Sequence, residues 1–416
     1  MAKVAIIGAG PAGLFAAEFL AQNGHIVSLY DAKPTAARKF LMAGHGGLNL
    51  THSEPLPAFL QKYRPQAPLL LQAIEQFTPH DLRAWALGLG QETFVGSSGR
   101  VFPESFKASP LLRAWLHRLS ALGVTIHYNA QWIGFDNEGY LKIAQSEGRA
   151  PNTRTQHIKL DAEAVLLALG GASWPKLGST GAWVPWLEEK GIDISRFQPS
   201  NCGFEAGFSA YFAERFKGVP LKRIALRFEQ QCIEGELMID GSGVEGGAIY
   251  ALSAAIRTAI CANGAASVQL DLKPDLSQQA LQKRLERPRG KQSTTNFLRK
   301  CTGLSPVALA LLREAGPLPT DAQSIAARIK TLTLELSAPR GLNRAISSAG
   351  GIKFTQVDKS FMLKKLAGVF VAGEMLDWEA PTGGYLLQGV FATAQAAAQG
   401  INYYLKEYKR QYSHFR

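Results

Sequence analysis

The sequence predicts an α/β fold in which one domain is interrupted by a second, inserted domain. The first 31 residues read as a strand, a helix and a second strand, the βαβ arrangement of a parallel sheet. AVLLAL at 164–169 is apolar throughout, as a strand buried on both faces should be, and GVFVAG at 368–373 resumes that character. Between about 196 and 344 the pattern changes, so we expect residues 1–195 and 345–416 to form one discontinuous domain around an insertion.

The N-terminal βαβ unit follows directly from the order of residues. KVAII at 3–7 is a short apolar strand, and GAGPAG follows it at 8–13. Residues 14–22 have helical spacing and end in a turn-forming Asn-Gly pair. IVSLY at 26–30 is the second strand, closed by Asp31. The unit has the length of about 30 residues that is typical of a Rossmann-like nucleotide-binding motif.

Further elements of the first domain follow along the chain. The stretch 36–52, AARKFLMAGHGGLNLTH, is glycine-rich and irregular, and we interpret it as a ligand-binding loop. Residues 109–122 carry their apolar side chains on one stripe, which predicts an amphipathic helix covering a sheet. VTIHY at 124–128 is the next strand, and residues 131–160 alternate as short strands with turns, which predicts a small antiparallel sheet.

The insertion, residues 196–344, combines strands with helices. Mixed strands are expected at 224–228, 232–239 and 267–271, and helical, basic segments from 277 to 333. We interpret this mixed β plus helical domain as the part that binds substrate or a partner.

Composition indicates a folded globular protein. Of the 416 residues 46% are hydrophobic and 19% charged, and the formal net charge of +12 favours polyanionic partners.

The sequence has no GxSxG, which argues against a serine hydrolase, and no His/Cys cluster with metal spacing, so we expect no metal. Neither a zinc knuckle nor a redox dithiol is expected, because no CxxC pair occurs among the four cysteines, Cys202, Cys232, Cys261 and Cys301. With no signal peptide or membrane span evident, we expect a cytoplasmic protein without membrane association.

The motif GxGxxG is a weak signal alone but a strong one between a strand and a helix. Gly8 permits the turn, Gly10 lets backbone N–H groups reach a diphosphate, and Gly13 lets the helix pack on the strand. Asp31, at the end of the second strand, is expected to accept hydrogen bonds from the ribose hydroxyls of adenosine. The alternative is a glycine turn that holds no nucleotide.

The C-terminal segment favours FAD over NAD as the bound nucleotide. FVAGEMLDWEAPTGGYLLQG at 370–389 reads as a strand, Gly373-Glu374, a loop, and Gly383-Gly384 opening a helix. A second glycine-and-acid element far from the first suits a long extended cofactor, and the helix dipole would stabilise negative charge on the reduced ring. A turn merely capped by glycines is the alternative.

Five further stretches give the chain a resemblance to a known family: RKFLMAGHGGLNLTH (38–52), GRVFPESFKAS (99–109), LALGGASWPKLGSTG (167–181), AISSAGGIKFTQVD (345–358) and VAGEMLDWEAPTGGYLLQG (371–389). With the N-terminal motif, they resemble the BaiN/RdsA family of NAD(P)/FAD-dependent oxidoreductases nearly from end to end. The resemblance implies a Rossmann-like FAD-binding domain of the two-dinucleotide-fold flavoprotein type. With the motifs, it predicts as cofactor-binding residues Gly8, Ala9, Gly10, Pro11, Ala12, Gly13, Asp31, Lys39, Gly44, Asn49, Gly170, Gly373, Glu374, Gly383, Gly384 and Tyr385.

One departure from the family pattern affects the chemistry. Many relatives have Arg-Cys-Asn in the loop after the second strand, whereas this chain reads Gly47-Leu48-Asn49. Asn49 and Thr51 remain, so flavin binding is still implied. Chemistry that the family assigns to the thiol cannot be carried over, and the chain resembles a divergent subgroup.

The resemblance implies a flavin-mediated reduction of an activated C=C bond, reported for a bile-acid intermediate in one branch and a uridine of ribosomal RNA in another. Because only one nucleotide fingerprint is present, NAD(P)H is expected to dock transiently as the electron donor. His45, Tyr385 and Glu374 are candidate proton donors or orienting groups.

The substrate stays open between RNA and a small molecule. Residues 283–300, KRLERPRGKQSTTNFLRK, carry seven Lys or Arg against one Glu and could follow phosphates, although an ordinary solvated surface is an equal alternative. A pocket for an apolar or steroid-like small molecule is the second hypothesis. The third is a non-catalytic flavoprotein that uses FAD for stability or redox sensing.

Overall fold

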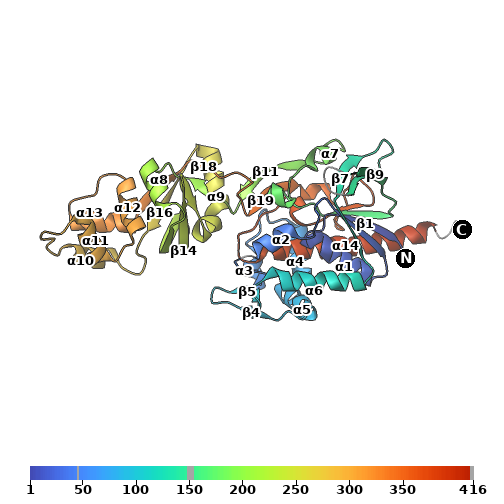
Figure 1. Cartoon of the computed structure of the whole chain (residues 1–416), viewed down its shortest axis with the longest axis horizontal. Coiled ribbons are helices and arrows are strands. Elements are labelled where there is room, and N and C mark those ends of the chain that lie inside the picture. The colour runs from blue at the N-terminus through green and yellow to red at the C-terminus, as the bar shows by residue number, and fades with distance from the viewer. Residues whose placement is uncertain (45, 148–153, 413–416) are drawn as a thin grey trace. The chain divides into compact units, whose positions relative to one another are not determined.

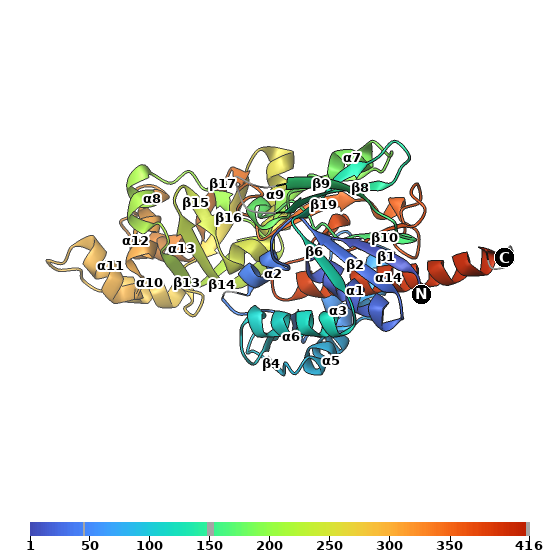
Figure 2. The same ribbon diagram turned by 45° about the vertical axis from the view of Figure 1, so that its right-hand side comes forward.

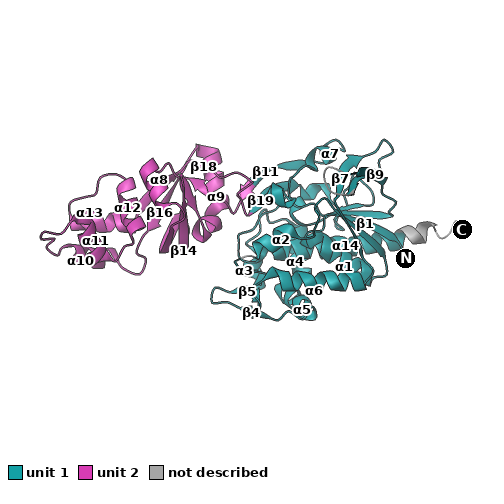
Figure 3. Ribbon diagram, in the orientation of Figure 1, with its two compact units in different colours: residues 1–198, 347–416 teal, residues 199–346 magenta. Residues whose placement is uncertain are grey.

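The computed structural model describes residues 1–44, 46–147 and 154–412. The described chain forms two compact units, unit 1 of residues 1–198 with 347–416, and unit 2 of residues 199–346 (Figure 3). Each unit has its own hydrophobic core. Substrate or partner binding by the inserted part stays a prediction.

A five-stranded parallel sheet forms the centre of unit 1. Its strands are β1 (Lys3–Ile7), β2 (Ile26–Asp31), β6 (Thr125–Tyr128), β10 (Ala164–Leu167) and β20 (Val369–Val371). They lie in the order β20, β10, β1, β2, β6, and every pairing is parallel. Figure 1 labels β1 of this sheet, and Figure 2 shows β6, β2, β1 and β10 next to one another. The five strands expected in the first domain are thus confirmed, and β10 is buried at every position, as its unbroken apolar sequence predicts.

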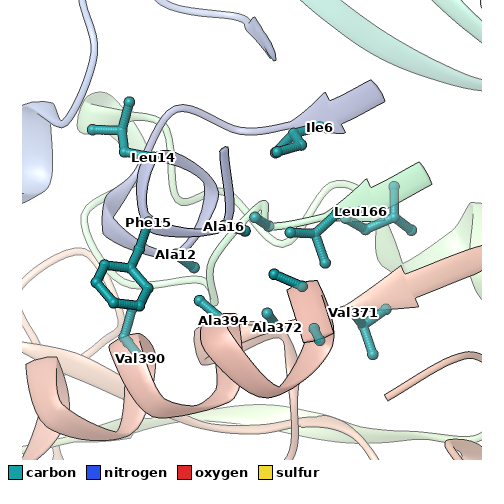
Figure 4. Packing of buried hydrophobic residues seen from close by; sticks show 14 of the residues in the cluster. Ile6, Ala12, Leu14, Phe15, Ala16, Leu166, Val371, Ala372, Val390 and Ala394 are labelled. Atoms are coloured by element: carbon teal, nitrogen blue, oxygen red, sulfur yellow. The ribbon is translucent and has the colours of Figure 1, made fainter. Parts of the chain in front are cut away.

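Long helices cover this sheet. α1 (Pro11–Gln22) packs against α14 (Tyr385–Tyr412) and α6 (Ala108–Ala121), and α14 also packs against α4 (Pro68–Gln76). The helix predicted at 109–122 is confirmed as α6, which buries Leu111, Leu112, Trp115 and Leu119. Figure 4 shows apolar side chains of α1, α14 and β10 meeting in the core of unit 1, so the first and last long helices lie side by side.

Two small sheets and several short elements complete unit 1. One antiparallel sheet joins β3 (Thr51–His52), β5 (Arg100–Pro103) and β4 (Thr93–Val95). The other, at the predicted excursion 131–160, joins β7 (Ala130–Phe135), β8 (Leu141–Glu147) and β9 (Arg154–Lys159). The remaining elements are α3 (Leu56–Leu60), α5 (Pro79–Gly88), α7 (Val184–Glu188), η1 (Pro175–Leu177), η2 (Phe354–Gln356) and η3 (Gly373–Met375).

The segment 36–52 is not irregular throughout, and the sequence prediction was wrong on this point. It contains the helix α2 (Arg38–Ala43), which ends where Gly44 follows. The six residues of α2 include good helix formers, and the buried ring of Phe40 anchors the helix.

Unit 2 is built on a seven-stranded sheet with antiparallel pairings. The strand order is β17 (Leu332–Leu336), β16 (Ala266–Asp271), β13 (Pro220–Phe228), β14 (Gln231–Asp240), β15 (Gly243–Glu245), β12 (Phe204–Glu205) and β18 (Ala338–Pro339). β13, β14 and β16 confirm the strands expected at 224–228, 232–239 and 267–271.

Six helices are described in unit 2: α8 (Ala210–Phe216), α9 (Gly247–Asn263), α10 (Gln278–Leu285), α11 (Thr294–Thr302), α12 (Pro306–Glu314) and α13 (Ala322–Lys330). The last four confirm the helical character predicted for 277–333. α9, which packs on β13 and β14, was not anticipated.

Two strands connect the units. β11 (Ile194–Ser200) leads out of unit 1 and β19 (Ser347–Ile352) leads back, and the two pair in a sheet of their own. β19 is buried at all six positions.

Candidate functional site

The N-terminal glycine turn places a helix start at the carboxyl end of β1. A Cβ at Gly8, whose φ is +108°, would lie 2.4 Å from the carbonyl oxygen of Ala168, and one at Gly13 would lie 1.9 Å from that of Gly8. Only glycine fits these two positions. Gly10 has no atom within 4 Å of its Cβ position, and as N-cap of α1 it makes no side-chain cap. The space beside Gly10, in front of the first turn of α1, is therefore open, as an anion site at a helix N-terminus requires.

The carboxylate of Asp31 is held by the backbone of two loops. It accepts hydrogen bonds from the amides of Ala9 (2.7 Å) and Lys33 (2.8 Å). Burial raises the pKa of the Asp31 carboxyl above its ordinary value, although both hydrogen bonds oppose the rise. Each carboxylate oxygen can accept further hydrogen bonds, as binding of a ribose requires. That Asp31 binds a ribose stays a prediction.

Three glycines lie at one edge of the central sheet. Because β20, β10 and β1 are neighbours and parallel, Gly373, Gly170 and Gly8 follow the carboxyl ends of adjacent strands. A Cβ at Gly373 would lie 3.1 Å from the Cβ of Ala12. The C-terminal glycine-and-acid segment therefore touches the N-terminal turn, at the edge where open α/β sheets bind ligands.

Glu374 and Lys39 form an ion pair at this edge. Lys39 Nζ lies 2.8 Å from Glu374 Oε2 and donates a second hydrogen bond of 2.7 Å to Ser173 Oγ. The side chains are 26% (Lys39) and 16% (Glu374) exposed, so solvent screens the pair only partly. Two residues predicted separately are thus brought together, from α2 and from the end of β20.

Gly383 and Gly384 bring the start of α14 against β3. Gly384 has φ +99°, and its Cβ would lie 2.4 Å from the carbonyl oxygen of Thr51. Thr51 Oγ1 lies 2.8 Å from Gln388 Oε1, and Gln388 Nε2 donates to the carbonyl oxygen of Phe77 at 2.6 Å. These buried contacts fix the segment that the sequence predicts to face the flavin ring.

Tyr385 is anchored by a side chain that the sequence analysis did not identify. Its hydroxyl donates to Glu54 Oε1 at 2.5 Å, its carbonyl oxygen accepts from the hydroxyl of Tyr63, and its ring stacks on His52 with centroids 5.3 Å apart. Burial, the hydrogen bond to Glu54 and the charge of Glu54 raise the pKa of the Tyr385 phenol well above its ordinary range. His52 is the last residue of the predicted loop 36–52, and Glu54 lies just after it. Only their contacts with Tyr385 identify these two residues.

The remaining predicted residues lie in the loop after α2. Gly44 packs against α6, since a Cβ there would lie 2.5 Å from the Cβ of Ala108, so packing alone requires this glycine. The predicted catalytic residue His45 lies outside the described residues. Asn49 Oδ1 is buried and has no hydrogen-bond partner within the described part of the chain.

A second buried polar atom lies near the glycine edge. Ser179 Oγ has no hydrogen-bond partner among residues 1–44, 46–147 and 154–412, and it lies 3.2 Å from a Cβ position at Gly170. Buried hydroxyl and amide groups are costly when unpaired, so such atoms point to a bound ligand. The open N-terminus of α1, Asn49 and Ser179 therefore fit an extended dinucleotide such as FAD.

Neither a metal-binding cluster nor a membrane-spanning helix is found in the described part of the chain. Within the described ranges, no three His, Cys, Asp or Glu side chains lie close enough to bind a metal together. No helix in the described part of the chain combines the length and apolar character needed to cross a bilayer.

Comparison with known proteins gives matches along nearly the whole chain. A family profile described as HI0933-like protein Rossmann domain matches residues 2–400. The chain is 23% identical to a 3-dehydro-bile acid delta(4,6)-reductase of Clostridium scindens, over 96% of this chain and 98% of the relative. It is 22% identical to a ribosomal RNA dihydrouridine synthase of Haemophilus influenzae, over 95% of this chain and 98% of the relative.

A solved structure shares the fold. The 3-ketosteroid delta1-dehydrogenase of Sterolibacterium denitrificans superposes with a TM-score of 0.50, covering 97% of this chain and 100% of that one, at 12% identity. At this identity the match concerns the fold alone.

Proposed function

The chain belongs to the HI0933-like Rossmann-domain family, the BaiN/RdsA family of FAD-dependent oxidoreductases, and we propose that it uses NAD(P)H to reduce an activated C=C bond. The names of two relatives support this reaction, since one is a delta(4,6)-reductase and the other forms dihydrouridine, a uridine with its ring double bond reduced. This chain matches both over nearly their full lengths.

The observation that carries the proposal is the meeting of three distant segments at one sheet edge. Gly8–Gly13, Gly170 and Gly373-Glu374 follow the ends of adjacent parallel strands, and the open space at Gly10, in front of α1, lies beside them. In this proposal the start of α1 binds the diphosphate and Asp31 binds the adenosine ribose. Asn49 Oδ1 and Ser179 Oγ form hydrogen bonds with the cofactor.

Bound FAD would supply the redox chemistry, and the side chains would orient its ring and the substrate. The ion pair with Lys39 suits Glu374 to a fixed acceptor role, because it holds the carboxylate in one position. For Tyr385, the hydrogen bond to Glu54 and the raised pKa favour an orienting role over proton donation. His45 stays a candidate proton donor.

The test is spectroscopic. Purified protein should be yellow with one FAD per chain, and anaerobic NADH or NADPH should bleach the flavin absorbance. A colourless protein that takes up no FAD would disprove the proposal. A yellow protein that neither nucleotide bleaches would favour the non-catalytic alternative.

RNA is the substrate class that a specific observation favours. All seven basic side chains of the segment 283–300 are exposed, on α10, on the loop after it and on α11: Lys283, Arg284, Arg287, Arg289, Lys291, Arg299 and Lys300. An exposed basic surface of this kind suits the phosphates of RNA.

Salt-dependent RNA binding tests this choice. Replacing Arg287, Arg289 and Lys291 with Ala should make the slope of log K against log salt shallower by about 2, since each single-strand phosphate contact contributes about 0.7. The matched control replaces three exposed basic residues elsewhere in unit 2, Lys217, Lys222 and Arg227. Equal slopes for both triple variants would favour the small-molecule alternative.

A further inference from the structure

The segment GRVFPESFKAS at 99–109 is one of the stretches that resemble the family, but none of its residues belongs to the predicted cofactor site. Its side chains lie beside that site. Along β5, Arg100 and Phe102 share one face, because the side chain between them, Val101, is fully buried on the other. Arg100 pairs in register with His52 of β3, so this face continues toward Tyr385, on which His52 stacks.

Arg100 is an exposed cation over the start of α14. Its Nε lies 3.8 Å from a Cβ position at Gly383, which has φ +126°. The guanidinium of Arg100 makes no hydrogen bond or ion pair to any residue that the structure describes. Its five N–H donors are therefore available to a ligand beside the predicted ring site.

Three phenylalanine rings continue the same face. Phe102 lies 5.8 Å from Phe94 and 5.5 Å from Phe106, centroid to centroid, and Phe94 and Phe106 are 4.9 Å apart. The rings of Phe102 and Phe106 lie 3.6 and 3.5 Å from a Cβ position at Gly47, in the predicted ligand loop. The aromatic cluster therefore borders the loop in which this chain lacks the family cysteine.

Phe106 is held in an unfavourable conformation. Its φ is +57°, rare for a bulky residue, yet the residue is 50% exposed. Its carbonyl oxygen accepts a hydrogen bond of 2.7 Å from Leu48 N, which ties the turn to the loop 47–49. Such a position costs free energy without burying the ring, which is typical of a functional surface.

From this arrangement, and resting on the proposed function, we propose that Arg100 with Phe94, Phe102 and Phe106 binds the substrate through a planar, conjugated carbonyl ring. The rings would stack on its face, and the guanidinium would donate hydrogen bonds to its carbonyl oxygen. A cation next to an aromatic surface, without an acidic partner, complements a flat ring that develops negative charge.

The charge arises during the reduction. Hydride addition to the β-carbon breaks the C=C π bond, and its electron pair moves onto the carbonyl oxygen as C=O becomes C–O⁻. Arg100 stabilises this oxyanion, and a proton from water then adds to the α-carbon as C=O re-forms. The substrate gains two electrons and two hydrogens, and the reduced flavin loses two electrons.

The test separates this site from the flavin site. The FAD-loaded full chain is reduced photochemically without NAD(P)H, and flavin reoxidation is followed after anaerobic mixing with one of two probes. The probes are 4-androstene-3,17-dione, an apolar enone, and a synthetic RNA hairpin with uridines in its loop. Whichever probe reoxidises the wild-type flavin identifies the source of the ring.

Arg100→Ala should lower that reoxidation rate by about 100-fold, the typical effect of removing one oxyanion donor, with FAD content unchanged. Arg100→Lys should recover part of the rate, and Phe106→Leu should raise the Kd of the probe by about tenfold through lost stacking. Arg154→Ala, an exposed arginine on β9, is the matched control and should reoxidise at the wild-type rate.

Other outcomes overturn the inference. A wild-type rate in Arg100→Ala, or loss of FAD from that variant, would remove Arg100 from the substrate site. So would a reduced wild-type protein that neither probe reoxidises. A chain that holds no FAD at all would instead disprove the proposed function, and the inference with it.

Discussion

Two sets of glycines, one in each unit, serve different purposes. In unit 1 a Cβ at Gly8, Gly384 or Gly400 would lie 2.4, 2.4 or 2.3 Å from a carbonyl oxygen of another segment. In unit 2, seven glycines with positive φ have nothing within 4 Å of that position: Gly207, Gly218, Gly241, Gly264, Gly290, Gly303 and Gly316. At the three sites in unit 1 glycine lets distant segments touch, whereas at these sites in unit 2 it only allows the chain to turn.

The largest loss of stability is expected for Gly13→Ala, where the close contact lies within the turn itself. The new methyl group would overlap the backbone of Gly8, so we expect a loss of more than about 3 kcal/mol in the free energy of unfolding, or no folded protein. Urea denaturation of purified chain measures this.

Gly10→Ala is the matched control in the same turn. Because nothing lies within 4 Å of the new methyl group and φ is −80°, unfolding free energy should change by less than about 0.5 kcal/mol. FAD affinity should fall by about tenfold or more, a cost of 1.4 kcal/mol per decade, because the methyl group occupies the space in front of α1. Full FAD retention in Gly10→Ala would refute this position for the diphosphate.

Next in size is the contrast between Gly384→Ala and Gly264→Ala. Both glycines have positive φ, but only Gly384 faces another backbone, at Thr51. We expect a loss of about 3 kcal/mol for Gly384→Ala and about 1 kcal/mol for Gly264→Ala, the ordinary cost of alanine in a left-handed helix cap. Similar thermal shifts for the two variants would show that the contact at Thr51 is not tight.

A smaller effect is expected where polar contacts join distant segments. Gln388→Leu leaves the Thr51 hydroxyl and the Phe77 carbonyl buried without a partner, which should cost about 1–3 kcal/mol. Gln279→Leu, exposed on α10 of unit 2, is the control and should stay within about 0.5 kcal/mol of the wild type. Chemical denaturation measures the free energy of unfolding of both variants. Equal values for the two would mean that the buried contacts of Gln388 do not stabilise the fold.

The smallest effect concerns pH and Asp31. Because burial raises the pKa of this carboxyl in the folded state, its contribution to stability is full below the unfolded value near 4 and is lost as pH rises through the folded pKa. The variant Asp31→Asn lacks this titration. The stability of the variant relative to the wild type should therefore increase between pH 4 and about pH 7. If the difference in unfolding free energy between variant and wild type stayed constant with pH, this would contradict the raised pKa of Asp31.

Individual elements were predictable because their signals are local. β1, β2, β10 and β20 follow from short apolar runs, and α6 follows from a stripe of leucines. α2 was mistaken for loop because the glycines after it dominate the composition of 36–52. α9 was missed because its start, Gly247, follows another glycine and its small residues weaken the helical pattern.

Contacts between residues far apart in the chain could not be predicted from local sequence signals. Nothing near Tyr385 in the chain indicates that Glu54 will accept a hydrogen bond from its hydroxyl, and nothing near Lys39 indicates that it will pair with Glu374. Arg100 and Phe106 carry no motif of their own, and they become candidates only beside Gly383 and Gly47.

The sequence by itself determined the nucleotide turn at Gly8–Gly13, the strands of the central sheet and the family to which the chain belongs. These depend on neighbouring residues, whose backbone preferences act over a few positions. Only the tertiary structure decided which side chains meet at the sheet edge. Parallel strand order and close glycine contacts set those meetings, and they arise from packing between segments that the sequence holds far apart.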